Sequence, residues 1–359
     1  MQAKNIALIE ICGSHDECLY SQYRFIRESG NNVFFIISDN LASRIKHYDD
    51  NLNILSLKFN NKLSNDLLKL LEIKKYLKKK RIDIVVLNTA SNEIISKLVY
   101  LIPNHIQIIG LLHSLKKLKH SFSQSLINKK VKKMFVLNDY LISHIPSIES
   151  INFQSIYTIY FKKPYIEVAK AQDEFWIAIP GNIQFSRRDY LGLIHNLESN
   201  DIPPNIKFLF LSSSNAKHSD AHKIKDLIYN KKYKDNFVFF DNYIMPDLMA
   251  GYISQSDLIL PLLNPGVAHY DDYMKYQISG TFNLSFAFAK PMLIHYDFEK
   301  IDDFAVSSFF CNDNHFFEKI FQLYNNRELI LDKCQSIAAY KKFDFDKQQA
   351  NYLNFLYST

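Results

Sequence analysis

Four residues able to transfer protons stand at the ends of two strand-like segments of this sequence. They are His15, Asp16, Glu17 and His113. The first three follow the apolar run 6–11 and a turn at Gly13, and the last follows the apolar run 107–112. An imidazole or a carboxylate in the first of these loops can accept the proton of a hydroxyl group, which predicts a general base among its three residues, whereas His113 could bond a hydroxyl or a phosphate group of a substrate. The alternatives are helix-start capping for His15 and Glu17 and an ordinary loop histidine for His113.

Two segments in the second half could bind an anion. Arg187 and Arg188 stand where a helix is expected to begin, and a guanidinium forms paired hydrogen bonds with phosphate oxygens. Ser279-Gly280-Thr281 opens another expected helix, where backbone N–H groups can face a phosphate and glycine permits close approach. We expect the two segments to form one phosphate site. A surface helix start and a simple N-cap are the alternatives.

A metal site is not expected. Asp271 and Asp272 are adjacent acids, a pattern that fits a solvated turn better than a metal-binding loop. The four cysteines show neither a CxxC pair nor zinc spacing, which argues against structural zinc and a disulfide framework. They are Cys12, Cys18, Cys311 and Cys334. A reduced, cytoplasmic setting is therefore predicted.

Short apolar runs rich in β-formers alternate with amphipathic segments and must position these residues. Strands are expected near 6–11, 33–38, 52–57, 82–88, 107–112 and 133–137, and again near 176–179, 206–211, 237–240, 257–261 and 292–295. Helices are expected near 17–28, 65–80, 189–197, 221–229, 246–253, 283–289 and 332–357. This alternation is typical of βαβ units and predicts an α/β fold with two doubly wound, Rossmann-like domains. Ligands of such sheets bind beyond the carboxyl ends of the strands, so we expect a site in a cleft between the domains.

The length of 359 residues favours two domains, and the pattern weakens over 147–175 before it starts again. We therefore expect an N-terminal domain over 1–165, a linker near 160–172, and a C-terminal domain over 172–331. A closing helix over 332–359 is expected to return towards the N-terminal domain. No apolar run reaches the roughly 18 residues of a membrane span, and no signal peptide is expected.

Charge is unevenly distributed along the chain. Residues 1–164 hold 24 Lys+Arg against 13 Asp+Glu, a net of +11, and since the whole chain carries +6 the remainder carries −5. Most of the positive charge lies in Lys74–Arg81 and Lys116–Lys133. These runs are either solvated helix faces or docking segments for an anionic membrane or a phosphorylated acceptor. Nucleic acid is not expected as a partner, because no nucleic-acid motif accompanies the charge.

Three segments of the second half together resemble the nucleotide-sugar domain of GT-B glycosyltransferases, in particular bacterial family 4-like enzymes of surface-polysaccharide synthesis. They are 179–190 (IPGNIQFSRRDY), 239–261 with FFDNY and SDLILP, and 278–292 (ISGTFNLSFAFAKPM). The first half resembles the family more loosely, at 13–17 (GSHDE) and 111–114 (LLHS).

The resemblance implies a GT-B fold and roles for individual residues. Donor nucleotide-sugar binding falls to Gly181, Asn182, Arg187, Arg188, Asp241, Tyr243, Lys275, Ser279, Gly280, Thr281 and Asn283. Acceptor binding falls to Gly13 and Ser14, and catalysis to His15, Asp16, Glu17 and His113. Retaining family members usually carry two glutamates seven residues apart in the third segment, but 278–292 contains none. Retention and inversion of configuration therefore both stay open.

The implied function is a metal-independent, cytoplasmic glycosyltransferase that uses a UDP- or GDP-linked sugar and no cofactor. Its acceptor would be a glycan or a lipid-linked sugar, with peripheral association at the inner membrane face. The alternatives are a nucleotide-sugar 2-epimerase of the same architecture and a non-catalytic scaffold that binds a glycan or a partner protein.

Overall fold

The computed structural model describes residues 2–59, 63–162, 166–198, 200–214, 219–312 and 315–358. It divides into two compact units, which confirms the predicted pair of parallel α/β domains. The first unit comprises Met1–Phe161, Lys275–Ile278 and Asp344–Thr359, and the second comprises Lys162–Met274 and Ser279–Phe343. The chain therefore returns to the first unit twice, once for four residues and once at its last helix.

The first unit holds a seven-stranded parallel sheet in the order β3-β2-β1-β4-β5-β6-β7. Its strands are β1 (Asn5–Glu10), β2 (Asn32–Ser38), β3 (Asn53–Leu57), β4 (Ile84–Leu87), β5 (Gln107–Leu112), β6 (Lys133–Leu137) and β7 (Asn152–Ile156). Its helices are α1 (Leu19–Glu28), α2 (Asp39–Ile45), α3 (Leu63–Lys79), α4 (Glu93–Leu101), α5 (Lys117–His120), α6 (Phe122–Lys130) and α15 (Phe345–Tyr357).

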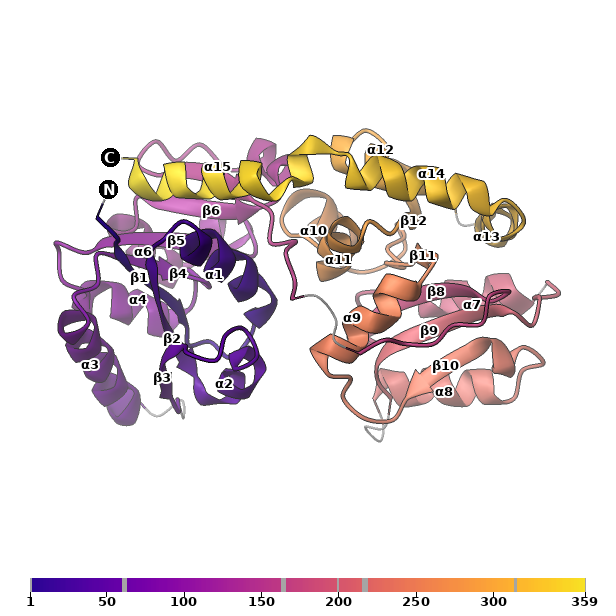
Figure 1. Cartoon of the computed structure of the whole chain (residues 1–359), viewed down its shortest axis with the longest axis horizontal. Helices are drawn as coiled ribbons and strands as arrows, with labels where there is room; N and C mark the ends of the chain where they lie inside the picture. The colour runs from indigo at the N-terminus through magenta and orange to yellow at the C-terminus, as the bar shows by residue number, and fades with distance from the viewer. Residues whose placement is uncertain are drawn as a thin grey trace. The chain divides into compact units, whose positions relative to one another are not determined.

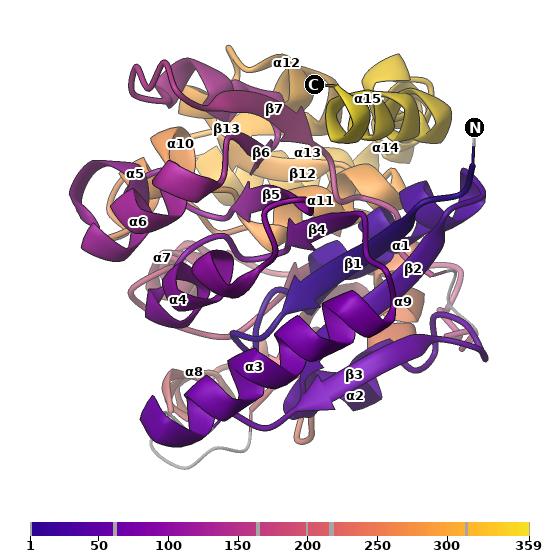
Figure 2. The ribbon, with the colours of Figure 1, turned by 90° about the vertical axis from the view of Figure 1, so that its left-hand side faces the viewer.

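Helices cover both faces of this sheet, since each face is an apolar surface that must be buried. Leu70, Leu98 and Ile127 of α3, α4 and α6 belong to one core, and Figure 2 shows α3 crossing in front of β1, β2 and β3. Phe25 of α1 and Tyr352 of α15 belong to the core of the other face. Strands that are buried on both faces consist of continuous apolar residues, and such runs can be recognised in the sequence.

The second unit holds a six-stranded parallel sheet in the order β10-β9-β8-β11-β12-β13. Its strands are β8 (Phe175–Pro180), β9 (Ile206–Ser213), β10 (Phe237–Phe240), β11 (Leu258–Ile259), β12 (Met292–His295) and β13 (Ser308–Cys311). Its helices are α7 (Tyr190–Glu198), α8 (Asp220–Tyr229), α9 (Pro246–Gln255), α10 (Tyr270–Lys275), α11 (Gly280–Phe288), α12 (Asp302–Ser307), α13 (Phe316–Asn325) and α14 (Arg327–Ala338).

The single helix expected over 332–357 is wrong, because the structure has two helices there, α14 and α15. They are separated by a short turn in which Phe343 stacks on Phe286 of α11, with ring centroids 4.4 Å apart. Asp344 then starts α15 by accepting a hydrogen bond from the backbone N–H of Lys347 at 3.0 Å, as an N-cap does. Figure 1 shows α15 running beside β6 in the first unit.

No helix among the described residues combines the length and the apolar character that a bilayer crossing requires.

Candidate functional sites

In the first unit, the polar residues cluster where the strand order reverses. β1 and β4 are neighbours in the sheet. The chain continues from β1 to β2 on one side of this pair and from β4 to β5 on the other. The crevice at such a reversal is the usual ligand position of a doubly wound sheet. The loops that follow β1, β4 and β5 place His15, Asn88 and His113 within direct contact of one another. Two of the four predicted proton-transfer residues thus meet although 98 positions separate them in the sequence.

The imidazole rings of His15 and His113 are stacked, with centroids 3.7 Å apart and planes within 11°. His15 has a left-handed backbone (φ 64°) just beyond Gly13 (φ 77°), an uncommon conformation for a residue with a side chain. Its carbonyl accepts a hydrogen bond from Asn88 Nδ2 at 2.9 Å. This bond ties the turn after β1 to the turn after β4 and holds the His15 ring over His113.

His15 is also paired with Glu17, at 3.2 Å between Nδ1 and Oε1. Burial lowers the pKa of His15, but the hydrogen bond and the negative charge of Glu17 outweigh it, so the pKa is raised overall. Because Nδ1 is occupied by Glu17, Nε2 is the nitrogen left to exchange a proton with a substrate. A carboxylate that orients an imidazole through one nitrogen is the arrangement that prepares the other as a general base.

His113 has the opposite character. Burial and the neighbouring His15 lower its pKa to about 3, so the ring is neutral at physiological pH. Its Nε2 lies 2.7 Å from the carbonyl oxygen of Asn88, which can only accept, and Nε2 therefore carries the proton. The Nδ1 of His113 is left as a hydrogen-bond acceptor, which suits a hydroxyl group and not a phosphate.

The other predicted residues of this unit lie nearby with different partners. Asp16 accepts from Arg44 Nη1 at 3.1 Å, so its carboxylate is not shared with the histidines. The carbonyl of Gly13 accepts from Asn40 Nδ2 at 3.3 Å, and Ser14 is exposed. Sequence reasoning missed Glu10, Asn88, Thr89 and Lys117, which complete the cluster. A lone acid in the apolar run 5–10 was the one signal that could have revealed it.

In the second unit, Arg188 joins the loop after β8 to the first turn of α11. Its Nη2 donates to the hydroxyl of Thr281 at 3.0 Å. A Cβ on Gly181 (φ 99°) would lie 2.9 Å from the same Nη2, so the guanidinium lies directly against this glycine turn. The buried Nη1 of Arg188 has no hydrogen bond of good geometry among the described residues, and the guanidinium interacts with the buried hydroxyl of Tyr190, where it opposes the rise that burial causes in the pKa of that phenol. A guanidinium held between a glycine turn and the start of a helix is suited to bind a phosphate oxygen.

The start of α11 offers a second set of donors beside Arg188. The hydroxyl of Ser279 accepts from the backbone N–H of Thr281 at 3.4 Å, which makes it the N-cap of the helix. Gly280 is exposed, and a Cβ built on it would meet no atom within 4 Å. An anion could therefore approach the first turn of this nine-residue helix without displacing a side chain.

The remaining predicted donor residues are more scattered. Asn182 and Arg187 are exposed on the loop after β8, and Asn283 is buried one turn into α11. Asp241 follows β10 and pairs with Lys225 at 2.7 Å, while Tyr243 is exposed two residues further on. Lys275 ends α10 and begins the four-residue segment that belongs to the first unit.

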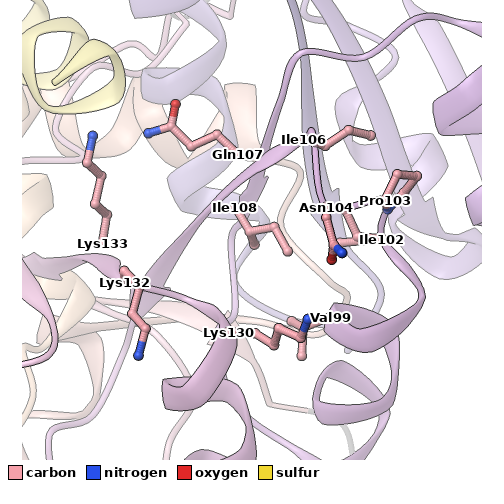
Figure 3. A pocket seen from close by; sticks show the side chains of 10 residues that line it. All are labelled: Val99, Ile102, Pro103, Asn104, Ile106, Gln107, Ile108, Lys130, Lys132 and Lys133. Atoms are coloured by element: carbon pink, nitrogen blue, oxygen red, sulfur yellow. The ribbon is translucent and has the colours of Figure 1, made fainter. Parts of the chain in front are cut away.

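A cavity of about 260 Å³ in the first unit lies at the other edge of the sheet, beside the amino ends of β5 and β6. Figure 3 shows apolar side chains such as Ile102 and Ile108 with three lysines around it. None of the predicted site residues lines this cavity. Lys133 points away from it to α15, where it donates to the carbonyl of Phe355 at 3.1 Å. The histidine and arginine sites are thus loop-end sites at the carboxyl edges of the sheets.

Nearly the whole chain is similar to solved structures. The Anabaena protein Alr3699/HepE in complex with UDP and glucose is 12% identical, with a TM-score of 0.71 over 99% of this chain and 100% of that one. A glycosyltransferase from Rickettsia africae ESF-5 is 14% identical, with a TM-score of 0.68 over 99% and 98% of the two chains. The chain has the GT-B fold.

GT-B similarity extends beyond transferases. A putative UDP-N-acetylglucosamine 2-epimerase from Listeria monocytogenes is 10% identical, with a TM-score of 0.63 over 98% of this chain and 95% of that one. No family model matches the chain, and no curated protein does so either. At these identities the likeness shows the fold alone, and the choice of reaction depends on the residues described above.

Proposed function

We propose that this protein is a glycosyltransferase that moves a sugar from a nucleotide-sugar donor to a glycan or lipid-linked acceptor. The observation that carries the proposal is Arg188, whose guanidinium spans from the Gly181 turn to the first turn of α11. The donor's diphosphate would bind there, and the negative charge that grows on it as the sugar leaves would be stabilised by the guanidinium and the helix start. Two similar structures contain UDP.

The first unit would serve the acceptor. In this proposal Nε2 of His15 removes the proton of the attacking hydroxyl, and the resulting positive imidazolium is stabilised by Glu17. The neutral His113 accepts a second substrate hydroxyl through Nδ1 and so orients the ring that carries the nucleophile. A base that removes the acceptor proton directly favours inversion of configuration.

The proposal is tested by incubating the protein with a panel of UDP- and GDP-sugars, with and without glycan or lipid-linked acceptors. Release of free nucleotide only when an acceptor is present is the expected result. Thermal melting with the same nucleotides shows which base is bound, since a ligand at 100 times its Kd stabilises a protein by about 2.7 kcal/mol. A protein that no nucleotide stabilises would be the non-catalytic scaffold instead.

A 2-epimerase is the second candidate, because two of the similar structures are a UDP-N-acetylglucosamine 2-epimerase and a putative one. It would convert the nucleotide sugar without any acceptor and leave the sugar attached to the nucleotide. Exchange of solvent deuterium into the sugar ring without nucleotide release would identify it.

We expect catalysis to be independent of divalent metal. Arg188 and the N-terminus of α11 supply the positive charge that a metal would otherwise bring to the diphosphate. Transfer rates measured with excess EDTA should stay within about twofold of the untreated protein, the scale of a minor electrostatic change. Loss of activity that Mg²⁺ or Mn²⁺ restores would overturn this expectation.

We further propose that α3 docks the protein on an anionic membrane, where a lipid-linked acceptor would lie. Leu67 and Leu68 are 49% and 66% exposed, and Lys75, Lys78 and Lys79 are exposed further along the helix. An exposed apolar segment followed by lysines suits the interface of an anionic bilayer. The second basic run contributes less, because its lysines are engaged elsewhere. Lys116 and Lys119 lie over the Tyr276 ring and Lys130 over Tyr100.

Charge reversal on α3 tests the docking. Lys75→Glu with Lys79→Glu should reduce binding to vesicles containing anionic lipid by roughly tenfold or more, at about 1 kcal/mol for each lysine removed. The control is Lys46→Glu with Lys58→Glu, which changes the same charge at exposed lysines of the same unit. Turnover of a soluble acceptor should be the same in both variants. If the α3 variant and the control variant bind vesicles equally, the lysines of α3 form an ordinary solvent-exposed helix face and do not dock the protein.

A further inference from the structure

Glu10 is a fully buried carboxylate beneath the histidine pair. It ends β1, whose other residues from Ile6 onwards are apolar and buried. Three donors contact it: the Thr89 hydroxyl at 2.5 Å, Asn88 Nδ2 at 2.8 Å and the backbone N–H of Cys12 at 2.9 Å. Burial raises the pKa of Glu10, and the three hydrogen bonds oppose this rise without cancelling it, so the pKa stays above its ordinary value. A group whose partners all donate is matched to the ionised form, since a protonated carboxyl would bring an unmatched donor.

Asn88 connects this carboxylate to both imidazoles. Its Nδ2 donates to Glu10 and, at 2.9 Å, to the carbonyl of His15. Its backbone carbonyl accepts from His113 Nε2 at 2.7 Å. Its Oδ1 is held by Gln22 Nε2 at 2.7 Å, so no rotation of the amide is free. Nδ2 of Asn88 therefore has two defined partners, its Oδ1 and its backbone carbonyl have one each, and Glu10 is the carboxylate among these four partners.

We propose that Glu10 is a positioning residue for the histidine pair, which fixes the His15 turn and the His113 tautomer through Asn88 and adds a second negative charge near His15. The part of this inference that concerns catalysis rests on the proposed function, in which His15 is the base. The part that concerns the two imidazoles does not depend on any activity.

The charge role can be separated from the other groups that face His15. These are Glu17, which touches Nδ1, the neutral His113 ring against its face, Glu10 below, and the Lys117 ammonium. Both carboxylates favour the charged imidazole, and Lys117 opposes them. Removal of the Glu10 charge alone should therefore lower the pKa of His15, while Glu17 stays in place.

The experiment is a pH titration of the ¹⁵N-histidine-labelled full chain by NMR, for the unaltered protein and for Glu10→Gln and Glu10→Asp. In the unaltered protein His113 should remain neutral with its proton on Nε2 from about pH 5 to pH 9, on the scale set by ordinary histidine titration. Glu10→Gln keeps the shape and loses the charge, so the His15 pKa should fall by about half a unit or more. Glu10→Asp keeps the charge but draws back the carboxylate, so it should change the His15 pKa less and disturb the His113 tautomer more.

Ser96→Ala is the matched control, because it removes a buried hydroxyl of the same unit that donates to the carbonyl of Glu93 at 2.7 Å and contacts neither Glu10 nor Asn88 through it. It should leave the His15 pKa unchanged. Folded Glu10→Gln with an unaltered His15 pKa and His113 tautomer would overturn the inference. If neither Glu10 variant folds, the titration of the unaltered protein tests the inference. A His113 that is charged, or that carries its proton on Nδ1, would contradict the inference.

The same variants separate this inference from the proposed function. If the protein transfers sugar, Glu10→Gln should shift the acidic limb of the kcat/KM profile by the amount seen for His15 and leave the KM for the nucleotide sugar unchanged. A His15 shift without any sugar transfer would sink the proposed function and keep the positioning role. Sugar transfer without a shift of the His15 pKa in Glu10→Gln would support the proposed function and contradict the positioning role.

Discussion

Arg188→Ala is expected to weaken the binding of UDP or GDP by roughly 10- to 100-fold. The expected size follows from the loss of a charge-assisted hydrogen bond, about 1.5–3 kcal/mol, at about 1.4 kcal/mol for each tenfold in affinity. Arg187→Ala should change the affinity by about threefold at most, because the exposed Arg187 has only the screened attraction of a surface charge to contribute. Isothermal titration calorimetry of the two variants provides the comparison.

Arg188→Lys sharpens the test of the phosphate site. Lysine keeps the charge but lacks the planar fork that reaches Thr281 and a phosphate at the same time. We expect an affinity between those of the unaltered protein and Arg188→Ala. If Arg188→Ala, Arg188→Lys and the unaltered protein bind the nucleotide equally, the phosphate does not lie against this arginine.

His15→Ala is expected to lower kcat by about 10²- to 10⁴-fold, the usual contribution of a general base, with nucleotide affinity unchanged. In the unaltered protein kcat/KM should rise with pH, since only the neutral imidazole can accept the proton. Glu17 raises the pKa of His15, so this acidic limb should lie at a higher pH than that of an ordinary histidine. Measurement of kcat/KM from about pH 5 to pH 9 covers the range of a perturbed histidine.

Glu17→Gln is the matched variant for the pH profile. Loss of the Glu17 charge lowers the pKa of His15, so the acidic limb should move to lower pH. The amide that replaces the carboxylate keeps a similar shape against His15, which limits other effects. A profile that is flat in the unaltered protein, or one that does not move in Glu17→Gln, would remove His15 from the role of base.

Most strands that sequence reasoning found are buried ones, although the edge strands β3 and β10 were also found. The runs at 33–38, 107–112 and 133–137 are apolar on both faces of a covered parallel sheet, and each became a strand. The strands it missed, β7 and β13, lie at the edges of their sheets. β7 has the sequence NFQSI and is mostly half-buried, so it lacks the continuous apolar signal.

The candidate site was predictable in part for a similar reason. Strand ends mark His15 and His113, because polar residues in the loop after an apolar run lie at the edge of the sheet, whereas Arg188 was marked by the expected start of a helix. The stacking of the two histidines was not predictable, since it depends on the sheet order β1-β4-β5 and on a left-handed turn at His15. Glu10 was missed because the apolar pattern identifies the strand but does not show which groups form hydrogen bonds with a buried acid at its end.

The return of α15 to the first unit has a consequence for the order of synthesis. The seven strands of that unit are all made before residue 157, but the apolar face formed by Phe25 and Phe135 is covered by Tyr352 of α15, with ring centroids 5.3 and 4.9 Å away. Domains usually fold in the order in which they are translated. Here the first sheet must wait with part of one face, the part beside α1, uncovered while the second unit is made. A chaperone that shields apolar surface during translation should therefore bind nascent chains that end before α15, and release them once α15 has docked.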